Sequence, residues 1–284
     1  MLRWYRRGER VAAWIPPRIA WVVCRVVGTL AYLLVPRLRR TLLDHQRRLV
    51  PGGTPAVRGR NARRVVATVA MNYYDLFRLP RRTPEYLRRY FTVAGREHVE
   101  AAAARGKGII FFGGHLGNFN YVAALAPTIR TPAVAVVERL DDPEMYDYFR
   151  RLRGHPDLEI VANGPKEVRT ILRTLRANGA VMMLCDRDVG GVTDDVLFFG
   201  ERTRLPAGPG IVARRTGAAI ICGTAYRTGP TSHALAFAPF VLPESDGTPD
   251  ERRAADTQAF ARVVERSIAQ APDQWAVLQP VWEQ

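Results

Sequence analysis

One histidine lies in a sequence context that suits chemistry. His115 follows the apolar run Gly108–Phe112, which predicts a buried strand, and it sits within the glycine-rich segment Gly113-Gly114-His115-Leu116-Gly117. A glycine-rich turn at the end of a strand can present an imidazole to a substrate. Because histidine titrates near neutral pH, it can act as a general base toward a hydroxyl group. His115 is therefore the candidate catalytic residue.

A histidine base needs a partner that fixes its tautomer and stabilises the imidazolium. The pattern from Leu116 to Leu125 predicts a helix. In such a helix Asn120 lies a little over one turn from His115 and within its reach. The alternative role for His115 is that of a turn residue whose ring bonds to the backbone.

A charged triplet, Asp186-Arg187-Asp188, directly follows the predicted strand Ala180–Cys185. Paired carboxylates beyond a strand can bind a metal or act as acid and base. No histidine is near them in the sequence, so we expect structural or substrate-positioning roles and no metal site.

Three further arginines are candidate anion ligands. Arg139 follows the predicted strand Ala133–Val137, while Arg202 and Arg204 precede Pro206–Gly210, which predicts the start of a helix. The amides of a helix N-terminus and arginine side chains both bind phosphate. The alternatives are a surface ion pair for Arg139 and a solvated hairpin around the other two.

Apolar runs alternate with helical patterns along most of the chain, which predicts a single α/β domain with a central sheet. Functional residues should then gather at the carboxyl edge of that sheet. We assign residues 1–50 to an N-terminal amphipathic helical region of the same domain and residues 51–284 to the α/β part. The predicted strands are Gly108–Phe112, Ala133–Val137, Leu158–Val161, Ala180–Cys185, Ala219–Ala225 and Ala234–Phe240. The predicted helices are Ala56–Leu79, Leu116–Leu125, Pro143–Arg153, Pro165–Ala177, Ala207–Thr216 and Glu251–Gln270.

The composition narrows the choice of partners. A net charge of +15 favours nucleic acid, anionic lipid or phosphorylated substrates. No helix-turn-helix, zinc or RNA-recognition signature is present, so we do not expect nucleic-acid binding. The three cysteines lie far apart and form no C-x-x-C pair, so the sequence suggests neither a disulfide framework nor a zinc site, and a reducing, cytoplasmic-side location fits.

The N-terminal region combines arginines with an apolar stretch. Four arginines precede Val11, and the apolar run from Val11 to Val35 is interrupted by Pro16-Pro17-Arg18 and by Arg25. A simple spanning helix needs about 20 mostly uncharged residues. We therefore expect helices that lie at an anionic membrane surface, with arginines reaching the phosphates. An amphipathic helix packed in the protein core is the alternative.

Taken together, these segments resemble the bacterial lysophospholipid acyltransferase-like family, which includes the late acyltransferases of lipid A synthesis. The similarity is greatest to the actinobacterial phosphatidylinositol mannoside acyltransferases. The matching pieces keep their order over nearly the whole chain. They are Gly114-His115-Leu116-Gly117-Asn118-Phe119, Val137-Glu138-Arg139-Leu140, Asp186-Arg187-Asp188, Phe198-Phe199-Gly200-Glu201 with Pro206-Ala207-Gly208-Pro209, and Pro272-Asp273-Gln274-Trp275 with Leu278-Gln279-Pro280-Val281-Trp282.

The resemblance implies a fold and an activity. The fold is a single α/β domain with a mixed sheet flanked by helices and amphipathic N-terminal helices, peripheral to the cytoplasmic face of the plasma membrane. The activity is transfer of a fatty acyl group from acyl-CoA or acyl carrier protein to a hydroxyl of a lipid or glycolipid, such as a phosphatidylinositol mannoside. No cofactor and no metal are expected.

The resemblance also implies roles for individual residues. The family motif is H-x-x-x-x-D/E, and here Asn120 stands at the acidic position. In the mannoside acyltransferases the glutamate of the FFGE segment is implicated as the partner of the histidine, and Glu201 matches it. The expected machinery is thus His115 as base, supported by Glu201 and Asn120. Arg139, Arg187, Arg202 and Arg204 would bind phosphates.

Two other functions stay open from the sequence. Asn120 motivates a specialised N- or O-acyltransferase of a biosynthetic pathway, since an amine acceptor needs less help from a base. It also motivates a catalytically degenerate homologue that binds lipid without transferring an acyl group. Product analysis with hydroxyl and amine acceptors would separate these functions. The oligomeric state is not readable from the sequence.

Overall fold

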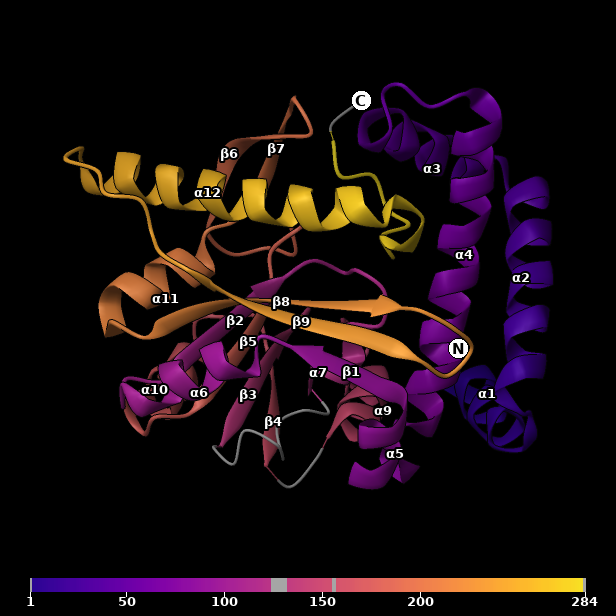
Figure 1. Ribbon diagram of the computed structural model, residues 1–284, viewed down its shortest axis with the longest axis horizontal. Coiled ribbons are helices and arrows are strands. Elements are labelled where there is room, and N and C mark those ends of the chain that lie inside the picture. Colours follow the sequence, from indigo (N-terminus) through magenta and orange to yellow (C-terminus); the bar gives the residue numbers. More distant parts are fainter. Residues whose placement is uncertain (1, 124–131, 155–156, 283–284) are drawn as a thin grey trace.

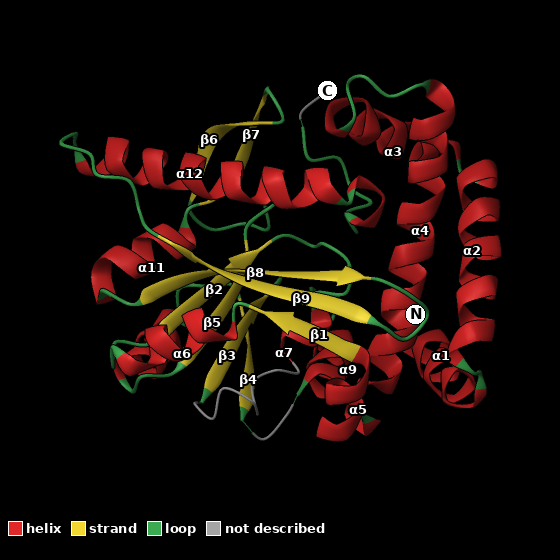
Figure 2. Ribbon diagram, in the orientation of Figure 1, coloured by secondary structure: helices red, strands yellow, loops and turns green. Residues whose placement is uncertain are grey.

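The computed structural model describes residues 2–123, 132–154 and 157–282. Helices flank both faces of a mixed sheet, and further helices stand beside it (Figure 2). The prediction of a single α/β domain with a mixed central sheet is confirmed.

The sheet has seven strands in the order β1-β9-β8-β2-β5-β3-β4. Strands β8, β2, β5, β3 and β4 are mutually parallel, β9 is antiparallel to β8, and β1 is parallel to β9. The carboxyl ends of the five parallel strands therefore share one edge. The bounds are β1 Phe91–Ala94, β2 Ile109–Gly113, β3 Ala133–Val137, β4 Leu158–Ala162, β5 Ala180–Leu184, β8 Ala219–Arg227 and β9 His233–Phe240.

Strand β2 is buried on both faces, which explains its continuous apolar run. Phe112 faces α12 and packs edge-on against Phe260, with ring centroids 4.6 Å apart. Phe111 points to the opposite face, against Phe237 of β9. The helices are α1 Leu2–Trp14, α2 Pro17–Leu34, α3 Pro36–Leu49, α4 Pro55–Arg78, α5 Pro84–Tyr90, α6 Arg96–Ala104, α7 Asn120–Ala123, α9 Pro143–Arg153, α10 Val168–Arg176, α11 Gly208–Thr216 and α12 Pro249–Gln270, with short 3₁₀ turns η1 Leu79–Arg81 and η2 Pro272–Gln274.

All six predicted strands are present, with ends that shift by at most two residues. One predicted helix is wrong. Residues 116–119 form a loop, and α7 begins only at Asn120. Residues 124 and 125 of that predicted helix lie outside the described part of the chain. Sequence reasoning did not identify β1, α5 or α6.

The N-terminal region is helical, as expected, and is divided by prolines. Pro17 and Pro36 each occupy the first turn of a helix, where a missing N–H costs no hydrogen bond. Helices α1, α2 and α3 all pack on the long α4, as Figure 1 shows. A Cβ at Gly28 of α2 would lie 2.7 Å from the backbone nitrogen of Ala67, so glycine permits this close helix crossing.

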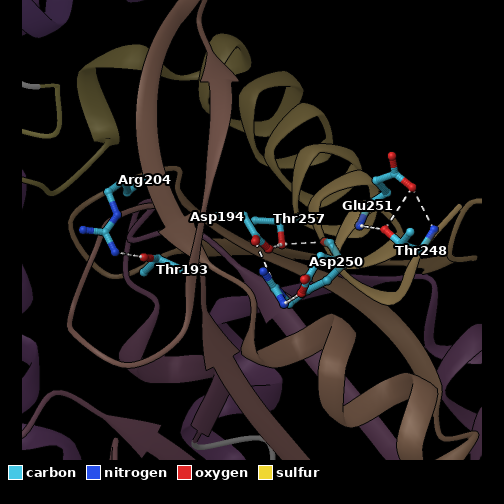
Figure 3. Close-up of polar contacts among 8 residues, drawn as sticks. Thr193, Asp194, Arg204, Thr248, Asp250, Glu251 and Thr257 are labelled. Carbon is cyan, nitrogen blue, oxygen red and sulfur yellow. Dashed lines mark hydrogen bonds and ion pairs between the residues drawn. The ribbon is translucent and has the colours of Figure 1, made fainter.

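Strands β6 (Thr193–Phe198) and β7 (Glu201–Pro206) form a separate antiparallel hairpin. Asp194 ties β6 to α12, because it accepts from the hydroxyl of Thr257 at 2.7 Å and from Nε of Arg253 at 3.0 Å (Figure 3). At the start of the same helix, Thr248 and Glu251 form a capping box. These contacts fix the hairpin against α12, and its strands are not part of the main sheet.

Candidate active site

The loop after β2 carries His115 and is held from two sides. The amide of Ala276 donates to the carbonyl of His115 at 2.7 Å, and the amide of Gly117 donates to the carbonyl of Gln274 at 2.9 Å. On the other side, the amide of Asn118 donates to the carbonyl of Ala225 in β8 at 3.0 Å. The C-terminal segment and the sheet therefore fix the backbone on both sides of the histidine.

Gly117 makes this loop possible. Its φ is +54°, and a Cβ would lie 1.8 Å from the carbonyl oxygen of Ala225. Only glycine fits such a left-handed, close approach. The carbonyl of Gly117 also accepts from Nδ2 of Asn72 at 2.6 Å, which adds a tie to α4.

The partner of His115 is Asp186, at the end of the adjacent strand β5. Nδ1 of His115 lies 2.7 Å from Oδ1 of Asp186, and the backbone amide of His115 donates to Oδ2 at 2.7 Å. A third donor, Nε1 of Trp275, also reaches Oδ2 at 2.7 Å. The carboxylate is inaccessible to solvent, while 16% of the histidine side chain is exposed.

This arrangement fixes the chemistry of the imidazole. A proton on Nδ1 donated to the carboxylate leaves the lone pair of Nε2 free to accept a proton. Burial alone would raise the pKa of Asp186, but the charge of His115 and the hydrogen bonds from His115 and Trp275 outweigh burial and hold that pKa below its ordinary value. Asp186 thus stays ionised and can stabilise an imidazolium.

Glu201 and Asn120, the two partners expected from the sequence, do not contact His115. Glu201 lies on the hairpin with 48% of its side chain exposed, and its Oε2 accepts from Nη2 of Arg48 at 2.6 Å. Asn120 accepts from Nε of Arg153 at 3.0 Å through Oδ1. The expected contact failed for Asn120 because the chain after His115 is a loop, and for Glu201 because β7 lies outside the main sheet.

A cavity of about 530 Å³ opens beside His115, at the carboxyl edge of the parallel strands. Its volume is typical of small-molecule sites. Its walls are largely apolar, with Phe119, Leu76, Val168 and Met182 among the lining residues. Such a cavity suits an extended apolar group whose reactive end meets the histidine.

The predicted phosphate ligands are scattered. Arg187 lines the cavity and pairs with Glu138 at 2.5 Å. Arg139 pairs with Glu167 at 2.8 Å and is largely exposed. Arg204 donates to the hydroxyl of Thr193 at 2.6 Å on the hairpin (Figure 3).

Two predicted residues of the binding set are surface groups. Arg202 is exposed on β7, opposite Leu197 of β6. Asp188 is exposed, and its Oδ1 accepts from the amide of Gly190 at 2.7 Å. Arg187 is thus the one member of the predicted arginine set that lines the cavity within the described residues. Across residues 2–123, 132–154 and 157–282, no three His, Cys, Asp or Glu side chains gather as a metal would require.

Three residues of the site were not singled out for these roles by sequence reasoning. Asp186 was expected to position substrate, Trp275 was only part of a matching segment, and Arg153 was not considered. The signal for Asp186 is its place after a strand, since β2 and β5 are neighbours in the sheet. That adjacency is a property of strand order, which no local pattern reveals.

Comparison with known proteins identifies the family of the chain. The family described as "Bacterial lipid A biosynthesis acyltransferase" matches residues 7–284. A phosphatidylinositol mannoside acyltransferase of Mycobacterium tuberculosis is 32% identical over 213 residues, covering 73% of this chain and 66% of the relative. Another from Mycolicibacterium smegmatis is 29% identical over 220 residues, covering 76% and 70%.

A more distant relative is the lipid A biosynthesis palmitoleoyltransferase of Escherichia coli. It is 24% identical over 192 residues, which is 66% of this chain and 60% of that enzyme. The chain thus spans just under two thirds of the length of the M. tuberculosis relative and less of the E. coli one. Because the family match covers almost every residue, the chain belongs to the bacterial lipid A biosynthesis acyltransferase family.

Proposed function

We propose that this protein transfers a fatty acyl group from an acyl thioester to a hydroxyl of a lipid or glycolipid. The observation that carries the proposal is the Asp186–His115 pair, with Nε2 free, at the edge of an apolar cavity. Membership of an acyltransferase family supports the reaction class. The names of the relatives support a glycolipid or phospholipid acceptor, such as a phosphatidylinositol mannoside.

The mechanism follows from the residues. The acyl chain lies along the apolar walls, and Nε2 of His115 removes the proton from the acceptor hydroxyl as its oxygen attacks the thioester carbonyl. The imidazolium that forms is stabilised by the buried Asp186. Collapse of the tetrahedral intermediate breaks the carbon–sulfur bond, and the departing sulfur takes the proton from Nε2. An ester and a free thiol result. The donor is acyl-CoA or acyl carrier protein.

The N-terminal helices support binding at a membrane surface. Helix α2 meets the length and hydropathy criteria for a membrane span, yet only 11% of it is buried in the protein. Its exposed face presents large apolar side chains. They are Ile19, Val22, Val23, Val26, Val27, Leu30, Leu33 and Leu34.

The packing of α2 favours a position along the surface over a crossing. Its opposite face rests on α4 through Gly28 and Tyr32, and the guanidinium of Arg63 lies 5.9 Å from the Tyr32 ring. A charged partner helix cannot enter the hydrocarbon with α2 without a large cost. We therefore infer a peripheral protein at the cytoplasmic face, with the apolar face of α2 in the lipid and arginines at the phosphates.

The alternatives of a specialised acyltransferase or a degenerate lipid-binding protein were motivated by Asn120. Asp186 supplies the carboxylate that position 120 lacks, so that motivation is removed. A hydroxyl acceptor needs a general base more than an amine does, so the intact Asp186–His115 pair favours O-acylation over N-acylation.

Product analysis tests the proposal. Purified protein is given palmitoyl-CoA or palmitoyl-acyl carrier protein with a membrane lipid extract, and thiol release and lipid products are measured, the latter by mass spectrometry. We expect release that depends on the extract and an O-acylated lipid product. An N-acylated product would favour the specialised enzyme. Binding without thiol release from either donor would favour the lipid-binding protein.

A further inference from the structure

One cationic side chain in the cavity has no acidic partner. Arg153, the last residue of α9, lines the cavity together with His115. Its Nε donates to Oδ1 of Asn120, and its guanidinium carbon lies 5.5 Å from the ring centroid of Phe149. Among the described residues, no Asp or Glu forms an ion pair with it.

The other cavity arginines are neutralised. Arg187 pairs with Glu138 at 2.5 Å, and Arg150 pairs with Asp147 at 3.2 Å. Arg153 differs in that its neighbour at hydrogen-bond distance is an amide. An amide oxygen orients the guanidinium without cancelling its charge, whereas a carboxylate at position 120 would form an ion pair.

An unpaired, partly buried guanidinium is costly to maintain. Burial lowers the pKa of Arg153 below its ordinary value, although Tyr73 acts in the opposite direction. Arginine nevertheless stays protonated in proteins. Loss of hydration around a retained charge costs free energy unless an anion compensates, and apolar walls strengthen the attraction to such an anion.

We propose that Arg153, held by Asn120, binds a phosphate ester of one of the two substrates inside the cavity. Nε is engaged by Asn120, and among the described residues the two terminal nitrogens of the guanidinium have no hydrogen-bond partner, so they can face a bidentate anion. This inference rests on the proposed function, because acyl-CoA, acyl carrier protein and phospholipid acceptors all carry a phosphate ester. Phosphate is the chemistry common to them.

Equilibrium binding separates the two sources of phosphate. Calorimetry measures the Kd of octanoyl-CoA and of its phosphate-free counterpart, the N-acetylcysteamine thioester. A second pair compares short-chain dihexanoyl phosphatidylinositol with dihexanoyl glycerol. Arg153→Met removes the charge and keeps the apolar stem. The control, Arg169→Met, removes an exposed arginine of α10 that does not line the cavity.

We expect Arg153→Met to raise the Kd of a phosphate-bearing ligand about 10- to 100-fold, which is the effect of losing one charge-assisted hydrogen bond. The phosphate-free counterpart should bind unchanged. An effect on octanoyl-CoA assigns the site to the donor, and an effect on phosphatidylinositol assigns it to the acceptor. Asn120→Asp should produce the same selective weakening, because its carboxylate would pair with Arg153.

Two results would overturn the proposal. One is an equal rise in the Kd of phosphate-bearing and phosphate-free ligands in Arg153→Met, which would indicate a collapsed cavity. The other is unchanged binding of both phosphate-bearing ligands in Arg153→Met. None of these binding measurements requires turnover. If the protein binds phosphate-bearing ligands selectively through Arg153 but transfers no acyl group, the proposed function is refuted and the phosphate site is still supported.

Discussion

Replacement of Asp186 by asparagine should reverse the tautomer of His115. Oδ2 of Asp186 accepts two N–H groups, from the backbone of His115 and from Trp275, each at 2.7 Å. The oxygen of an asparagine must occupy that position to keep both bonds. Its NH₂ then faces Nδ1 of His115, where Oδ1 now lies at 2.7 Å. Nδ1 must accept, so the proton moves to Nε2 and the base is lost.

The expected loss is large. In a serine-protease triad, the same exchange lowers kcat by about 10⁴-fold. Since Asp186 is fully buried and both of its oxygens are engaged, we expect a fall in kcat of about 10³- to 10⁴-fold, or roughly 4–5.5 kcal/mol of barrier. The fold should persist, because the side-chain volume is unchanged. Thiol release under saturating donor measures kcat, and thermal unfolding verifies the fold.

Glu201→Gln is the matched control, because it makes the same chemical change at the partner that the sequence suggested. Glu201 is half exposed and bonded to Arg48, so its loss should change kcat by no more than about twofold. A folded Asp186→Asn protein with kcat within tenfold of wild type would refute the tautomer argument. A loss confined to Glu201→Gln would restore the assignment made from sequence.

Three further predictions concern the Trp275 donor, two buried histidines and the exposed face of α2. Trp275→Phe removes the indole donor to Asp186, so kcat should fall about tenfold, measured by thiol release; an unchanged kcat in the folded variant would exclude a positioning role. Burial lowers the pKa of His45 to about 4, against the opposing charge of Asp44, and burial together with Arg227 and Arg82 lowers the pKa of His233 to about 2. Near about pH 5 these histidines therefore take up protons mainly in the unfolded chain. The free energy of unfolding should therefore have its full value above about pH 6.5 and fall by about 1.4 kcal/mol per pH unit per histidine as the pH drops toward 4. Urea unfolding at several pH values measures this slope, and His233→Phe should reduce it. Val26→Asp with Leu30→Asp, on the exposed face of α2, should lower partition into anionic vesicles at least about tenfold in flotation assays without changing the thermal midpoint; unchanged partition would exclude this face as the contact.

The strands were predictable because their signals are local. Continuous apolar runs bounded by turns locate β2, β3 and β5 within a residue or so. The position of His115 at a strand end follows from the same pattern. Strand order is not local, however, and it is the pairing of β2 with β5 that brings Asp186 to His115.

The absence of a bond from Asn120 or Glu201 to His115 has physical explanations. The residues after His115 have a sequence pattern that favours a helix. However, Gly117 adopts a left-handed conformation, and the loop around it forms hydrogen bonds with Gln274 and Ala276. These tertiary contacts override helix propensity and turn Asn120 away from the histidine. Glu201 follows an aromatic pair that packs against Trp282, so the position of the hairpin depends on a contact between residues 84 positions apart in the chain. A contact of that range leaves no local pattern in the sequence.

The measurement that tests the central claim most directly is acceptor-dependent thiol release by His115→Ala, compared with wild type under the same donor and lipid extract. The account predicts a fall in kcat of at least about 10³-fold with the thermal midpoint preserved, because the variant lacks the imidazole that lines the cavity and is paired with the buried Asp186. Release within tenfold of the wild-type rate by folded His115→Ala protein would contradict His115 as the base.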